Sequence, residues 1–131
     1  MSTQFDASND ELTERILGVA IDVHRELGSA ESEATYKKAL EIGLDDEGLD
    51  VSVEHAFEQT YRGEAVSTGF IDILVEEQVV LELKSVKRTT RAHFNQLGRN
   101  VQAVNATRGL LLNFGEPTLG ITRYINSKAA E

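Results

Sequence analysis

The stretch from Phe70 to Val86 reads Phe-Ile-Asp-Ile-Leu-Val-Glu-Glu-Gln-Val-Val-Leu-Glu-Leu-Lys-Ser-Val, and it decides the fold. Apolar residues alternate on both sides of residues 76–78, which predicts two strands joined by a tight turn. If the hairpin is centred on Glu77, the odd-numbered positions form one apolar face that belongs to the core. The predicted pairs on this face are Ile71 with Leu83, Ile73 with Leu81 and Val75 with Val79.

The opposite face of this hairpin carries two acidic residues. The same register places Asp72 opposite Glu82, with Lys84 two residues further along on the same face. Cross-strand β-carbons lie about 5 Å apart, and like charges at that distance destabilise the pair. A divalent cation such as Mg²⁺ would neutralise the carboxylates, and Lys84 could orient a water molecule or offset the charge of a phosphate. The pattern therefore indicates a metal site.

An ordinary solvated face is the alternative explanation of these charges. In that case Lys84 would only screen Asp72 and Glu82 on an exposed hairpin. Leu74 and Val80 share the face with them, so it is not plainly polar. The residues of the hairpin alone leave both explanations open.

Length and composition limit the class of protein. The 131 residues fit one domain with a self-sufficient core. The sequence has no cysteine, which excludes a disulfide scaffold, a thiolate zinc site and a cysteine nucleophile. Residues 1–9 lack the basic and apolar regions of a signal peptide, and no apolar run is long enough to span a bilayer. We therefore expect a cytoplasmic protein with no membrane contact.

The net charge of −9 argues against a polyanionic partner until its distribution is considered. Residues 83–115 contain no Asp or Glu, and this segment holds six basic residues: Lys84, Lys87, Arg88, Arg91, Arg99 and Arg108. A positive segment on an acidic body suits a phosphate backbone that approaches from one side. The candidate nucleic-acid contacts are Lys87, Arg88, Arg91 and Arg99. An ordinary basic helix paired with acidic neighbours would explain the same charges.

Three further stretches have the spacing of helices. A capping-box pattern opens at Ser8, and an apolar stripe follows it as far as Gly28. The second and third predicted helices cover about residues 31–47 and about residues 89–106, the latter capped by Thr89 or Thr90. His24 lies beside the first stripe, and we interpret it as a structural histidine.

Short apolar runs predict the remaining strands. Residues 61–69 are expected to turn through Arg62-Gly63-Glu64 into the central hairpin, and His55 in the strand before them is interpreted as structural. The predicted strands outside the hairpin are residues 51–57, 109–114 and, as a short edge strand, 121–125. The result is one α/β domain over residues 8–126, with helices packed on a mixed central β-sheet in the order ααβββαβ and tails at 1–7 and 127–131.

These motifs, taken in order, resemble a known superfamily. Asp72, then Glu82-Leu83-Lys84 on the next strand, then a helix that carries Gln96 resemble the PD-(D/E)XK nucleases, whose core is restriction-endonuclease-like. Five segments are similar to the small GxxExxY family within that superfamily, over about residues 10–126. They are Gly28 to Tyr36, Asp72-Ile-Leu-Val, Leu81-Glu-Leu-Lys-Ser-Val, His93-Phe-Asn-Gln-Leu and Leu110-Leu-Leu-Asn-Phe-Gly.

The resemblance implies a metal-dependent phosphodiesterase in which Asp72 and Glu82 bind Mg²⁺ or Mn²⁺ and Lys84 supports the attacking water. Glu33 matches the glutamate of the motif and would join the metal shell directly or through water. The helix dipole alone also favours an acidic residue in this first helical turn. Gln96 matches a glutamine that helps to hold the site or the substrate.

Three positions depart from the pattern of the family. Ala30 stands at the glycine of the motif, Phe70 replaces a basic residue, and Asn100 occupies a position where a tyrosine is usual. We expect a nuclease, we favour DNA over RNA as its substrate, and we expect weak or structure-dependent selectivity that a homodimer would improve. The alternative is a catalytically inactive nuclease-fold module that binds nucleic acid or protein.

Overall fold

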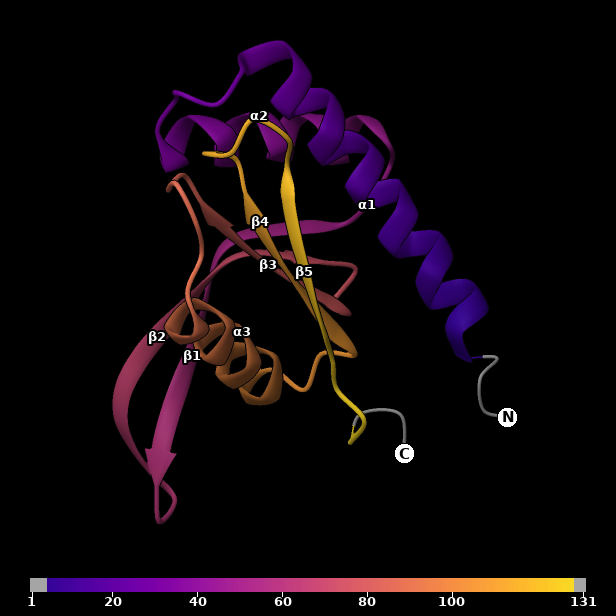
Figure 1. Cartoon of the computed structure of the whole chain (residues 1–131). Helices are drawn as coiled ribbons and strands as arrows, with labels where there is room; N and C mark the ends of the chain where they lie inside the picture. The colour runs from indigo at the N-terminus through magenta and orange to yellow at the C-terminus, as the bar shows by residue number, and fades with distance from the viewer. Residues whose placement is uncertain (1–4, 129–131) are drawn as a thin grey trace.

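The computed structural model describes the backbone of residues 5–128 and the side chains of residues 11–128. Five strands form one mixed sheet, with α1 and α2 on one face and α3 on the other (Figure 1). The predicted α/β class is therefore confirmed. The elements in chain order are α1 (Phe5–Leu27), α2 (Glu33–Asp46), β1 (Val51–Tyr61), β2 (Glu64–Val75), β3 (Val79–Lys84), α3 (Arg91–Ala103), β4 (Arg108–Asn113) and β5 (Gly120–Ile125).

The sheet has the order β1-β2-β3-β4-β5, and only β3 and β4 pair in parallel. A parallel pair needs a long crossover connection, and α3 supplies it. All six residues of β4 are buried, because helices cover both faces of the sheet at its centre. The carboxyl ends of β3 and β4 meet at one edge, where Lys84 is the register partner of Asn113.

The helices follow the predicted stripes but differ at their ends. In α2 the side chain of Ser32 accepts a hydrogen bond of 3.1 Å from the backbone of Thr35, and Thr90 caps α3. The predicted start of α1 at Ser8 is wrong, because the helix already begins at Phe5. Residues 5–7 contain neither Gly nor Pro, so nothing stops the helix there. Residues 1–4 and 129–131 of the predicted tails lie outside the described residues, and no helix within residues 5–128 is long and apolar enough to cross a membrane.

The first hairpin is longer than its sequence predicts. The turn consists of Arg62 and Gly63, both with positive φ, and strands continue on either side of it. The prediction that residues 61–69 form a turn is therefore wrong beyond these two residues. The polar residues of this region gave no strand signal because they are exposed on both faces. The end of the hairpin projects from the body of the protein (Figure 1).

The core consists of two apolar clusters, one on each face of the sheet. Ile73, Val75, Leu81 and Leu83 face α1 and α2, as the predicted alternation requires. The pairs Ile73 with Leu81 and Val75 with Val79 are confirmed. Ile71, however, belongs to the cluster beneath α3, so its predicted position on the same face is wrong.

The pairing of β1 with β2 is irregular at Asp72, next to this exception. Opposite this residue, Glu54 of β1 has a φ of 53°, and the backbone N–H of Leu83 is bonded to the Asp72 side chain at 2.9 Å. The regular β2–β3 pairing accordingly ends at Ile73 and Leu81. The period-two alternation is thus interrupted at Asp72, whose carboxylate is a predicted metal ligand.

Candidate active site

Asp72 is fixed by the backbone of the next strand. Its Oδ2 accepts the 2.9 Å hydrogen bond from Leu83 N, and its side chain keeps 28% of its surface exposed. One carboxylate oxygen is therefore held in place, and the carboxylate remains accessible from solvent. This combination suits a group that binds a ligand in a fixed position.

Glu82 lies beside Asp72 in a partly buried position on β3. Burial raises the pKa of Glu82 to about 8, and the negative charge of Asp72 acts in the same direction. The hydrogen bond from Asn100 and the charge of Lys84 lower this pKa, but they do not compensate. Burial and the charge of Asp72 therefore favour a proton on this pair of carboxyl groups in the metal-free site, and a cation bound there would displace it.

Asn100 of α3 orients the Glu82 carboxylate. This side chain is buried, and its Nδ2 donates a hydrogen bond of 2.7 Å to Glu82 Oε2. Gln96 Nε2 donates to Asn100 Oδ1 at 3.0 Å, so Gln96 acts on Glu82 through Asn100. The sequence identifies Asn100 only as a departure from the family pattern and predicts no role for it in the site. Its position four residues after Gln96 on the same helix face is the signal that could have found it.

Lys37 of α2 is a second residue that sequence reasoning missed. Its Nζ lies 3.8 Å from Asp72 Oδ1 and is bonded to Glu54 Oε2. Burial lowers the pKa of Lys37, but the hydrogen bond with Glu54 and the charges of Asp72, Glu54 and Glu33 outweigh burial and raise it. A permanent positive charge thus stands next to Asp72. Its spacing of four residues from Glu33, along one face of α2, was the available signal.

Glu33 is exposed in the first turn of α2 and points to the segment after β3. Its Oε2 accepts a hydrogen bond of 3.4 Å from the backbone of Ser85. Among residues 11–128, no three or more His, Asp or Glu side chains form a group that could hold a metal ion. The structure therefore brings Asp72 and Glu82 together, and it does not bring Glu33 to the same point.

Tyr36 fastens the loop that precedes Glu33. Its hydroxyl donates a hydrogen bond to the backbone oxygen of Gly28 and accepts one of 3.1 Å from the backbone of Glu31. The ring stacks on Phe114 with a centroid distance of 4.4 Å. This packing joins Tyr36 to the start of α2, where Glu33 lies three residues earlier. The tyrosine holds the helix end that carries the glutamate.

Lys84 ends β3, and the segment after it is held by Asn113. The Asn113 side chain accepts a hydrogen bond of 3.1 Å from Val86 N and donates one of 2.9 Å to Val86 O. The backbone of Gly115 packs directly against the backbone of Val86, because a β-carbon on Gly115 would lie only 2.4 Å from Val86 O. The end of β3 and the start of the basic segment thus have a fixed position at the sheet edge.

The basic segment is only partly a surface feature. Lys87 and Arg88 are exposed in the loop before α3, and Arg91 and Arg99 are exposed on α3. Arg108 is 4% exposed and reaches Thr13 of α1, so its predicted place in a positive surface segment is wrong. It is buried because β4 is an inner strand of the sheet, and α1 lies over this part of it. His24 is also buried, and it contacts the backbone of Glu116.

Comparison with known proteins gives the family. The model described as "PD-(D/E)XK nuclease superfamily" matches residues 10–124. The chain belongs to this superfamily. The predicted resemblance is thereby confirmed at the level of the superfamily, and the mixed sheet with three helices is consistent with its restriction-endonuclease-like fold.

Two solved chains match this PD-(D/E)XK protein. One is "Crystal structure of SSO0001", with a TM-score of 0.58 and 18% sequence identity over 74% of the present chain and 52% of that chain. The present chain thus spans about half the length of that structure, and at this identity the likeness concerns the fold alone. None of the curated proteins matches the chain.

Proposed function

We propose that this PD-(D/E)XK protein is a metal-dependent nuclease that hydrolyses phosphodiester bonds of nucleic acids. Membership of the superfamily supports the substrate class. The observation that carries the proposal is the close pair of Asp72 and Glu82, in which burial and like charge raise the pKa of Glu82 to about 8. Such a pair is unfavourable as two carboxylates and becomes favourable around a divalent cation.

The chemistry of these residues fits Mg²⁺ or Mn²⁺. Both donors are carboxylate oxygens, and hard cations are often held by one or two carboxylates together with several waters. Such a site needs no third acidic side chain in direct contact, so Glu33 would act through water. When bound, the cation supplies positive charge to the phosphoryl oxygens and lowers the pKa of a water molecule.

The residues of the chain hold and orient the reacting groups. The backbone of Leu83 fixes Asp72, and Asn100 fixes Glu82. Lys84, at the end of the same strand, would position the attacking water or offset charge that develops on the phosphate. Gln96 keeps Asn100 in its orientation.

Exposed basic residues would contact the phosphate backbone beside this centre. Lys87 and Arg88 lie in the loop after β3, and Arg91 begins α3. Contacts of this kind position the substrate without reading its sequence. We therefore propose weak sequence selectivity, with DNA as the first substrate to test and a homodimer as one means to enlarge the contact surface.

We further propose that the protein belongs to the GxxExxY branch of the superfamily. The loop held by Tyr36 and the outward position of Glu33 support this assignment. Ala30 stands at the glycine position of the motif, and the hydroxyl of Tyr36 bonds the backbone of Gly28 and of Glu31, on either side of it.

The decisive experiment is a calorimetric titration of Mn²⁺ into the wild type and Asp72→Asn, followed by incubation of both with labelled single- and double-stranded DNA and RNA. The wild type should bind Mn²⁺ and cleave in its presence, and Asp72→Asn should lose both properties. Asp22→Asn, a change of the same type on the exposed face of α1, is the matched control and should behave as the wild type. A wild type that binds no Mn²⁺ would overturn the proposal. Metal binding without cleavage would favour the inactive binding module.

A further inference from the structure

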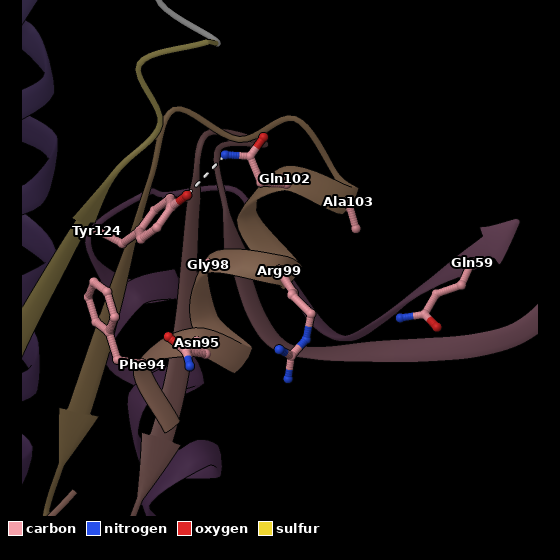
Figure 2. Close-up of a pocket in the computed structure, with 8 residues that line it drawn as sticks. All are labelled: Gln59, Phe94, Asn95, Gly98, Arg99, Gln102, Ala103 and Tyr124. Atoms are coloured by element: carbon pink, nitrogen blue, oxygen red, sulfur yellow. Dashed lines mark hydrogen bonds between the residues drawn. The ribbon is translucent and has the colours of Figure 1, made fainter. Parts of the chain in front are cut away.

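A pocket of about 630 Å³ lies between α3, β5 and the projecting part of β1 (Figure 2). Six residues of α3 line it together with Gln59 of β1 and Tyr124 of β5. It is within the usual size range of sites for small organic groups. The three α3 side chains that the following argument uses are Phe94, Arg99 and Gln102.

One wall of this pocket is aromatic. The rings of Phe94 and Tyr124 lie 5.7 Å apart at an angle of 54°, and both are half-buried. Gly98 permits this arrangement, because a β-carbon there would lie 2.8 Å from the Tyr124 ring. Gln102 Nε2 donates a hydrogen bond of 3.0 Å to the Tyr124 hydroxyl and holds the ring (Figure 2).

The polar groups that line the pocket are side-chain amides and the guanidinium of Arg99. Gln59 and Arg99 face each other across the opening (Figure 2). Amides offer donors and acceptors together, and a guanidinium offers donors to a carbonyl or a phosphate. A flat aromatic group with a mixed polar edge and a nearby phosphate would use all three kinds of lining. A nucleobase of a nucleic-acid strand has this chemistry.

The pocket is connected to the metal-binding carboxylate through α3. The Arg99 guanidinium donates a hydrogen bond of 2.8 Å to Gln96 Oε1. Gln96 donates to Asn100, and Asn100 donates to Glu82. Arg99 therefore belongs both to the wall of the pocket and to the chain of side chains that orients Glu82. A strand that crosses the active site would have this pocket beside it.

We propose that this pocket binds an unpaired base of the nucleic-acid substrate, so that the protein prefers single strands and frayed or looped regions to a complete duplex. The inference rests on the proposed function for its substrate class, although it concerns binding and not cleavage. A base within a duplex would first have to be unpaired and unstacked to enter, and this extrusion costs free energy. A single strand does not incur this cost.

The test is fluorescence anisotropy with a labelled 12-nucleotide DNA strand and its matching duplex, both titrated with the whole chain in EDTA so that no cleavage occurs. The wild type should bind the single strand about tenfold more tightly than the duplex. The double change Asn95→Leu and Ala103→Leu fills the pocket from two exposed positions of α3, and it should remove this preference. Arg99→Gln should reduce the preference, and Arg123→Gln, an exposed arginine outside the pocket, should leave it unchanged.

Equal affinity of the wild type for both ligands would overturn the inference. So would an undiminished preference in the pocket-filling variant, provided that a thermal melt shows it to be folded. If that variant does not fold, the single-strand preference of Arg99→Gln is compared with that of Arg123→Gln, and equal preferences would overturn the inference. Metal-dependent cleavage without a single-strand preference would refute base binding in the pocket and support the proposed nuclease activity. A preference that the pocket variants remove, in a protein that does not cleave, would refute the nuclease and leave the pocket.

Discussion

Asn100 Nδ2 donates a hydrogen bond of 2.7 Å to Glu82 Oε2, and this contact joins α3 to the strand that carries the proposed metal ligand. Its loss should weaken metal binding, because partners of this kind fix the orientation of a ligand. Asn100→Leu should lower the affinity for Mn²⁺ by about tenfold in calorimetric titration. Asn95→Leu, an exposed change on the same helix, is the control and should leave the affinity unaltered. An unchanged affinity of Asn100→Leu would refute this role.

The raised pKa of Glu82 predicts a pH dependence of stability in the metal-free protein. The pKa is about 8 in the folded state against an ordinary value of 4.5, so the folded state binds more protons than the unfolded state between these pH values. The free energy of unfolding should therefore fall as the pH rises from about 5 to 8. Urea unfolding in EDTA measures this slope. Glu82→Gln cannot titrate and should show a shallower slope, and identical slopes for both proteins would contradict the prediction.

Lys37 should compete with the metal ion for Asp72, since its ammonium group lies 3.8 Å from Asp72 Oδ1. Lys37→Met should bind Mn²⁺ about fivefold more tightly, the change expected from a contribution of ~1 kcal/mol. The metal-free variant should also be less stable, because two carboxylates lose a positive neighbour. Lys38→Met is the matched control, as Lys38 is exposed and pairs with Glu41. Weaker binding by Lys37→Met would show that the lysine assists the site.

Asn113 should be important for stability, because its buried amide makes several hydrogen bonds across the sheet edge. Asn113→Leu removes these bonds and leaves Val86 without a partner side chain. The free energy of unfolding should fall by about 2 to 3 kcal/mol in urea titrations. The exposed change Asn95→Leu should alter it by less than about 0.5 kcal/mol. A loss of the same small size in Asn113→Leu would contradict this assignment.

The central hairpin and the acidic pair could be predicted because local rules determine them. A tight turn at residues 76–78 sets the register of the strand pair, and Asp72 and Glu82 lie close together just beyond the regular pairing, which ends at Ile73 and Leu81. The stripe of Tyr36, Leu40 and Leu44 on α2 was likewise predictable and is buried.

Other features depend on contacts between distant segments, and local sequence patterns do not determine them. Ile71 changes faces because Glu54, in another strand, takes a left-handed backbone conformation next to Asp72. Arg108 is buried by a helix that lies far away in the sequence. Lys37 and Asn100 reach the site from α2 and α3, and only the packing of both helices on the sheet brings them there.

The stack of Tyr36 on Phe114 ties α2 to the segment after β4, and this contact limits how far the chain can be shortened from its N-terminal side. A fragment that starts at β1 would keep Asp72, Glu82 and Lys84, but it would lose Tyr36 and Glu33 and would uncover the apolar face of the sheet that α1 and α2 protect. The helices α1 and α2 are therefore part of the same core as the strands that carry these residues. We expect the smallest fragment that folds to be nearly the whole of this chain, and the family match over residues 10–124 has a similar extent.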